Sequence, residues 1–133
     1  MKRERSAADE KLVERLRSIC LALPEVIERP SHGECAWFVG GKKTLATLDD
    51  HHHGATHLAF WCPAPLGIQA MLVEARPDDF FVPPYVGHRG WIGMRLRRDG
   101  ERKRAVNWVE VARCLEDAYR LVAPKKLVAQ IKA

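Results

Sequence analysis

The chain has 133 residues, of which 47% are hydrophobic and 29% are charged, and its formal net charge at pH 7 is +5. This length fits one domain over residues 1–133 that buries a core without disulfides or metals to stabilise it. No apolar run approaches the roughly 20 residues of a membrane-spanning helix, and the charged N-terminus lacks the apolar segment of a secretory signal. These features exclude disordered and membrane-spanning classes and predict a soluble, cytoplasmic protein with no membrane partner.

Four cysteines, Cys20, Cys35, Cys62 and Cys114, have apolar neighbours and no CxxC spacing. Such residues are typical of reduced thiols in a core rather than of a disulfide framework or a zinc site. We therefore expect free thiols, which agrees with a cytoplasmic location.

The first half of the chain predicts one helix and several strands. Apolar residues at helical spacing indicate an amphipathic helix over residues 7–23, which Pro24 ends. Four short β-like runs follow, separated by turn signals and by a polar loop over residues 49–54. We expect these runs to form an antiparallel meander over residues 26–31, 35–39, 44–48 and 57–62.

A second helix is expected over about residues 66–75. Pro65 suits its first turn, Leu66 and Met71 are expected on its apolar face, and Pro77 lies beyond its end. The chain is thus expected to pass from strands to a helix before it enters a Pro-rich loop.

The residues from 91 to 98 alternate between apolar and polar side chains, which predicts a strand with one buried face. Strict alternation places Trp91, Arg95 and Arg97 together on the other face. Asp99-Gly100 marks a turn after this strand.

The last helix is predicted to begin after Asn107. Asn107 would cap its first amides while Glu110 reaches back to the cap, and an apolar stripe continues as far as Val122. Pro124 is expected to end this helix before a basic tail.

Five short motifs follow one another along the chain: Leu23-Pro24-Glu25-Val26, Gly40-Gly41-Lys42-Lys43, Pro84-Tyr85, Gly90-Trp91-Ile92, and Tyr119-Arg120-Leu121-Val122-Ala123 with Lys125-Lys126-Leu127. In this order and spacing they resemble the MmcQ/YjbR family, over a core of about residues 10–128. The resemblance implies an α+β fold of the CyaY-like or double-wing kind. It would have an antiparallel sheet of about five strands packed against N-terminal, middle and C-terminal helices. It also implies DNA binding, the activity with which family members are commonly labelled.

One departure from the family is visible. A lysine often stands near the end of the family strand that corresponds to residues 57–62, where this chain has Trp61-Cys62. Any anion contact of that lysine is therefore missing here. The Gly40-Gly41-Lys42-Lys43 motif lacks the spacing of a phosphate loop, so no nucleotide site is predicted there.

Basic residues concentrate after the predicted strand, and they are the strongest anion-binding candidates. Arginine suits phosphate because its planar fork donates paired hydrogen bonds. We expect a non-enzymatic DNA-binding domain in which a basic β-hairpin contacts phosphates without reading bases, with Trp91 available to stack on an unpaired base. The expected nucleic-acid-binding residues are Arg95, Arg97, Arg98, Arg102, Lys103, Arg104, Lys42 and Lys43. The competing interpretation is a solvated hairpin with Trp91 packed under the loop at 83–85.

An alternative function is a small-molecule or protein-interaction module. Prolines hold aromatic residues in the loop over residues 78–85, which is typical of a preformed surface. The alternative groove would involve Tyr85, His88 and Trp91, with a small acidic ligand or a protein as partner. The same aromatic residues are equally expected if they only close the core.

The sequence holds no catalytic signature. Asp49 to His53, together with His57, concentrate possible metal ligands, but a polar loop accounts for them and no metal ligands are predicted. His32 and Cys35 are close enough to pair as base and thiolate, although a turn between strands explains both. These patterns favour a protein that is not an enzyme and predict no cofactor.

Overall fold

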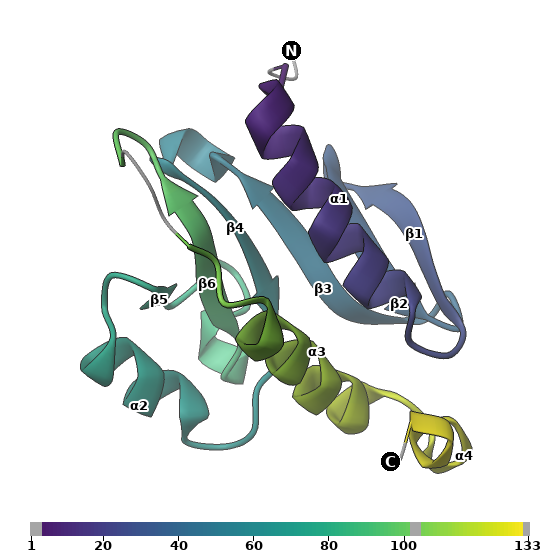
Figure 1. Ribbon diagram of the computed structural model, residues 1–133. Helices are drawn as coiled ribbons and strands as arrows, with labels where there is room; N and C mark the ends of the chain where they lie inside the picture. The colour runs from purple at the N-terminus through teal and green to yellow at the C-terminus, as the bar shows by residue number, and fades with distance from the viewer. Residues whose placement is uncertain (1–3, 102–104, 132–133) are drawn as a thin grey trace.

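The computed structural model describes residues 4–101 and 105–131, and Figure 1 shows their arrangement. The helices are α1 (Ala7–Leu21), α2 (Ile68–Ala75), α3 (Trp108–Val122) and α4 (Lys125–Val128). The strands are β1 (Val26–Ser31), β2 (Glu34–Val39), β3 (Lys43–Asp50), β4 (His57–Cys62), β5 (Phe80–Phe81) and β6 (Ile92–Arg98). Three 3₁₀ turns, η1 (His52–Gly54), η2 (Gly87–Arg89) and η3 (Ala129–Ile131), complete the described chain.

The six strands form one antiparallel sheet in the order β1-β2-β3-β4-β6-β5. Helices α1 and α3 cover one face of this sheet, whereas α2 lies beside β5 at one edge (Figure 1). The predicted α+β class is confirmed. The sixth strand was missed because β5 has only two residues, too few to show a period.

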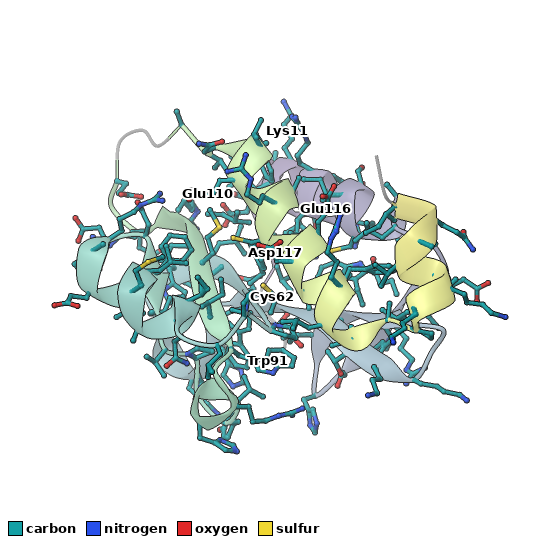
Figure 2. The ribbon with its side chains drawn as sticks, turned by 90° about the horizontal axis from the view of Figure 1, so that it is seen from below. Lys11, Cys62, Trp91, Glu110, Glu116 and Asp117 are labelled. Atoms are coloured by element: carbon teal, nitrogen blue, oxygen red, sulfur yellow. The ribbon has the colours of Figure 1, made fainter. Side chains whose placement is uncertain are left out.

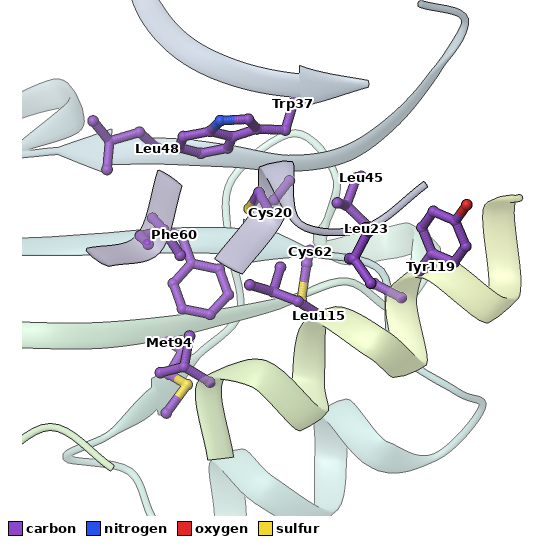
Figure 3. Close-up of a cluster of buried hydrophobic side chains, with 14 of the residues drawn as sticks. Cys20, Leu23, Trp37, Leu45, Leu48, Phe60, Cys62, Met94, Leu115 and Tyr119 are labelled. Atoms are coloured by element: carbon purple, nitrogen blue, oxygen red, sulfur yellow. The ribbon is translucent and has the colours of Figure 1, made fainter. Parts of the chain in front are cut away.

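The core lies between the sheet and the two long helices. Phe60 and Met94 are paired neighbours on β4 and β6, and they pack on the same side as Leu115 of α3 (Figure 3). Tyr119, also fully buried, donates a hydrogen bond of 2.7 Å from its hydroxyl to the backbone oxygen of Pro24. Burying side chains of this size stabilises the fold by about 1.5–3 kcal/mol each, so this layer fixes how α3 lies on the sheet.

Helices α1 and α3 each begin directly after a residue whose side chain caps the first turn. The side chain of Ser6 accepts a hydrogen bond from the Asp9 amide, and Asn107 accepts one from the Glu110 amide, as predicted for α3. The Glu110 carboxylate does not complete the expected capping box. It instead forms an ion pair with Arg76, the residue after α2, and so links α2 to α3.

Two sequence predictions on secondary structure were wrong. The segment expected as a polar loop begins inside β3, because Asp49 and Asp50 are buried strand residues whose carboxylates are paired with other side chains. Leu66, expected on the apolar face of the second helix, precedes that helix and is fully exposed. A further short helix, α4, follows Pro124 where only a tail was expected.

A β-bulge separates the two arginines that were expected on one face of β6. Ala59 of β4 pairs with Arg95, but the next residue, Leu58, pairs with Arg97, so β6 carries one extra residue there. Arg95 contacts His57 on the open side, whereas Arg97 contacts Asp9 of the covering helix α1. The prediction that the two arginines share a face is therefore wrong.

No helix in the described part of the chain is long and apolar enough to cross a membrane. The four cysteines are free, and Cys20 and Cys62 are buried. Burial raises the pKa of the Cys62 thiol well above its ordinary value, which keeps it protonated at neutral pH.

Candidate ligand-binding groove

An open groove of about 1160 Å³ lies along the face of the sheet away from α1, and its lining extends to Leu121 and Val122 at the C-terminal end of α3. Figure 2 shows Trp91 on this side of the molecule and Lys11 of α1 on the opposite side. Thr47 of β3 and Trp61 of β4, which are paired neighbours, belong to its floor. The lining includes residues near both ends of β3, so the groove follows this strand, whose eight residues span about 27 Å.

One wall of the groove is the segment from Tyr85 to Trp91, which is held in place from α2. The Gln69 side-chain amide donates to the backbone oxygens of Gly87 at 2.8 Å and Trp91 at 2.6 Å. Trp91 itself is buried, with the Arg89 guanidinium 5.6 Å from its ring centre. The Trp91 ring is thus packed inside the protein and offers little area at the groove surface.

The groove is lined by more basic than acidic side chains. Lys42 and Lys43 lie at the β2–β3 turn and Arg89 lies in the wall, and all three are exposed. Glu34 is the only acidic residue among the described residues that line the groove. This imbalance makes the local potential positive and attracts anions.

Aromatic rings gather at the end of the groove near η1. Tyr85 is 67% exposed, and its hydroxyl hydrogen-bonds Nε2 of His53. The His52 ring meets the rings of Tyr85 and Trp61 edge to face, at centroid distances of 6.0 and 5.3 Å. Tyr85 is thus an exposed ring held by polar and aromatic neighbours.

Three residues that line the groove have left-handed backbone conformations. The φ angles are 54° at His32, 52° at His53 and 68° at Tyr85. A side chain with Cβ adopts this region at a cost, and such residues tend to cluster at functional sites. Their concentration here supports the groove as the functional site.

A buried carboxylate lies beneath the groove floor. Asp49 accepts hydrogen bonds from His57 Nε2 at 2.9 Å, from Trp61 Nε1 at 2.8 Å and from the His52 amide at 2.9 Å. Burial alone would raise the pKa of Asp49, but these three donors together lower it, so the group stays ionised. It fixes Trp61 and the start of η1 under the groove.

Arg95 determines the proton position on His57. Its Nε lies 3.1 Å from His57 Nδ1, and because a guanidinium only donates, Nδ1 must accept. The remaining proton of a neutral ring is then on Nε2, which faces Asp49. Arg95 also donates hydrogen bonds to the backbone oxygens of Pro77 and Asp78, and its guanidinium lies over the Phe81 ring. These contacts hold the segment before β5 against the sheet.

The other two described arginines of the predicted DNA-binding set also have intramolecular partners. Arg97 pairs with both carboxylate oxygens of Asp9 and, through Nη1 at 2.6 Å, with Asp99. The more exposed Arg98 lies 3.2 Å from an oxygen of Asp78. Arg102, Lys103 and Arg104 lie outside the described residues, and β6 is the last strand among the residues that are described.

The structure therefore divides the predicted site residues into two places. Lys42, Lys43, Tyr85 and Trp91 line the groove, whereas Arg95, Arg97 and Arg98 lie outside its lining. His88, of the alternative ligand set, lies in η2 and is also outside the described lining.

Several groove residues were not selected from the sequence as site residues. Of these, Arg89 was the easiest to predict from the sequence, because it lies between predicted site residues in one short loop. Trp61 and Thr47 gave no such signal, since their place in the floor depends on pairing between strands.

The sequence patterns raised two kinds of chemistry, metal binding and a reactive thiol, and both can be compared with the described residues. No group of three or more His, Cys, Asp or Glu among them is arranged to hold a metal ion. Burial raises the pKa of Cys35, so its thiol is protonated and a poor nucleophile at neutral pH. The groove has the features of a binding site: a concave surface, basic side chains and exposed aromatic area.

The protein is a small α+β domain, with helices on one face of an antiparallel sheet and a groove along the other face that reaches the end of α3. The family model described as YjbR matches residues 21–121, about three quarters of the chain, so the protein belongs to the YjbR family. The resemblance inferred from its sequence motifs is thereby confirmed. No curated protein and no solved structure matches the chain.

Proposed function

We propose that this YjbR-family domain binds DNA mainly through phosphates, and that the groove on the open sheet face is its binding surface. The observation that carries the proposal is the convergence of Lys42, Lys43 and Arg89 in one groove beside the exposed ring of Tyr85. Basic side chains supply the affinity for the backbone, and an aromatic surface suits the bases.

The groove is a better candidate than the arginines of β6. For a phosphate to recruit Arg97, the arginine would have to break its two-pronged pair with Asp9, a carboxylate that is 4% exposed, and such a loss is costly at a buried charge. Lys42 and Lys43 are exposed at a turn, so they can turn toward a ligand without breaking such a pair.

Three basic side chains predict a moderate dependence on salt. Each phosphate contact changes the slope of log K against log salt by about −0.7 for single strands and −0.9 for duplexes. Three contacts therefore weaken binding about 20- to 40-fold between 50 and 200 mM salt.

The test is a fluorescence-anisotropy titration with labelled oligonucleotides at these two salt concentrations. Lys42→Glu with Lys43→Glu should weaken binding by at least about tenfold. The matched control is Lys11→Glu with Arg113→Glu, which makes the same change in charge on exposed residues of the covering helices α1 and α3. Equal losses in both variants would show a response to net charge alone and would contradict the groove, as would the absence of binding by the wild type.

A compact acidic ligand is the second candidate. It is favoured by the proximity of Arg89 to a rigid aromatic wall, since typical small-molecule sites combine apolar lining with a few charged groups. Complete displacement of labelled DNA by micromolar nucleoside monophosphate would favour this candidate over an extended polyanion.

A further inference from the structure

We propose that the groove takes an unpaired nucleic-acid strand in preference to a duplex, with the exposed ring of Tyr85 as the platform on which a base stacks. This inference rests on the proposed function and specifies the ligand of the same groove. It goes beyond phosphate binding because it assigns a role to the bases.

The shape of the surface favours a single strand. A protein reads a duplex by inserting a protruding helix or β-ribbon into one of its grooves. Here Lys42, Lys43 and Arg89 line a recess in the sheet face. A flexible single strand can enter such a recess and keep its phosphates near the basic side chains.

The length of the groove suits an extended chain. Lys43 begins β3, and His52 lies just beyond the end of that strand, about 27 Å away along the sheet. Known single-strand sites cover about 4–16 nucleotides and track the backbone in a positively charged groove. The β3 groove is long enough for several nucleotides, with lysines at one end and histidines at the other.

Tyr85 offers the ring face that stacking requires. Trp61 and Trp91 are buried, so they contribute little area to a base, whereas Tyr85 is 67% exposed. Its hydroxyl hydrogen bond to His53 and its edge contacts with the His52 and His53 rings restrict the ring before any ligand arrives. A prepositioned ring loses little conformational entropy on binding.

A second, independent observation also points to a ligand. His52 lines the groove. Its Nε2 atom is buried and has no hydrogen-bond partner among the described residues. A buried polar atom without a partner is costly, and a group that binds there and pairs with it removes this cost. The polar edge of a base stacked on the neighbouring Tyr85 could supply the missing partner.

The experiment compares three labelled ligands of equal length: a single strand, the matching duplex, and a strand in which the central nucleotides lack bases. The wild type should bind the intact single strand more tightly than either of the others. Tyr85→Ala should weaken binding of the intact strand about 5- to 150-fold, the range expected for the loss of one base–aromatic stack. It should leave the strand without central bases nearly unaffected. Tyr85→Phe keeps the ring but lacks the hydrogen bond to His53, so it should lose clearly less affinity than Tyr85→Ala.

The outcomes separate this inference from the proposed function. Binding of the duplex as tightly as the single strand, with loss in the Lys42/Lys43 variant, would overturn the single-strand inference and leave DNA binding by the groove intact. Failure of every oligonucleotide to bind would overturn both. Tyr85→Phe losing as much as Tyr85→Ala, with unchanged melting temperatures, would overturn the stacking role.

Discussion

Arg97 on β6 and Asp9 on α1 form a two-pronged ion pair between residues 88 positions apart in the sequence, with an Nη2–Oδ2 distance of 2.7 Å. The hydrogen bond to Asp9 is the main reason that the pKa of Arg97 is raised. The pair joins the first helix to β6, the strand next to the short edge strand β5, and Asp99 extends it to the turn after β6. Arg97 thus contributes to the stability of the fold by linking α1 to β6.

Replacing Arg97 by Gln should lower the free energy of unfolding by about 3 kcal/mol, because the buried Asp9 carboxylate loses its two-pronged guanidinium pair. Urea denaturation followed by circular dichroism measures this change. Arg98→Gln is the matched control on the same strand. Its partner Asp78 is well exposed, and the loss should stay below about 1 kcal/mol. Similar losses in the two variants would contradict a structural role specific to Arg97.

Replacing Asp49 by Ala should lower the free energy of unfolding by about 3 kcal/mol, because the donors from His57, Trp61 and the His52 amide then lack their acceptor. Asp49→Asn retains one acceptor oxygen and should lose less. Thermal unfolding compares these variants with Asp78→Ala, an exposed aspartate whose removal should change stability by about 0.5 kcal/mol or less. An Asp49→Ala variant as stable as Asp78→Ala would refute this role.

Gly93→Ala tests the close packing of Phe81 on β6. A Cβ at Gly93 would come within 2.4 Å of the Phe81 ring, which also stacks on His57. We expect a loss of about 1–3 kcal/mol in the free energy of unfolding. Adding Phe81→Ala removes the clash, so a double-mutant cycle should show a smaller cost of Gly93→Ala in that background. An unchanged cost would mean that the ring is not the obstacle.

The turn after β6 should give the protein a measurable response to acid. Hydrogen bonds from His51 and then from Arg97 lower the pKa of Asp99 to about 2, from an ordinary value of 3.8. A carboxylate whose pKa is lower in the folded state stabilises that state at every pH above its pKa in the unfolded chain. This contribution is lost as the pH falls from about 4 towards 2. Asp99→Asn lacks the contribution at every pH.

Urea titrations of the wild type and Asp99→Asn, repeated from about pH 6 down to about pH 2, measure this contribution. The difference between their free energies of unfolding should be largest near neutral pH and should shrink below about pH 4. A difference that stays constant across this range would show that the Asp99 carboxylate contributes nothing through its charge.

Much of the fold could be predicted from local sequence signals. The bounds predicted for β1 and β4 agree with the structure, and Asn107 caps α3 as its sequence indicates. Alternation and capping are local properties, so they are visible in a short stretch of sequence. Asp49 was misassigned because a buried aspartate depends on donors from β4, which the residues around it do not reveal.

The candidate site was less predictable because it depends on contacts between strands. The sequence singled out Lys42, Lys43 and Tyr85, which lie in a turn, at the start of β3 and in a loop, but it grouped the lysines with the β6 arginines. A period of two residues assigns Arg95 and Arg97 to one face, whereas a bulge against β4 sends them to different partners. One extra residue in a strand pairing was enough to change the expected binding surface.

The position of β1 at the edge of the sheet has a consequence for self-association. An edge strand leaves backbone groups available for pairing with another chain, and charged residues and proline are common protections against such pairing. β1 contains Glu28, Arg29 and Pro30 in succession, and proline has no amide hydrogen to donate to an added strand. This edge therefore resists strand-by-strand polymerisation, which protects a small, sheet-rich protein from aggregation at high concentration.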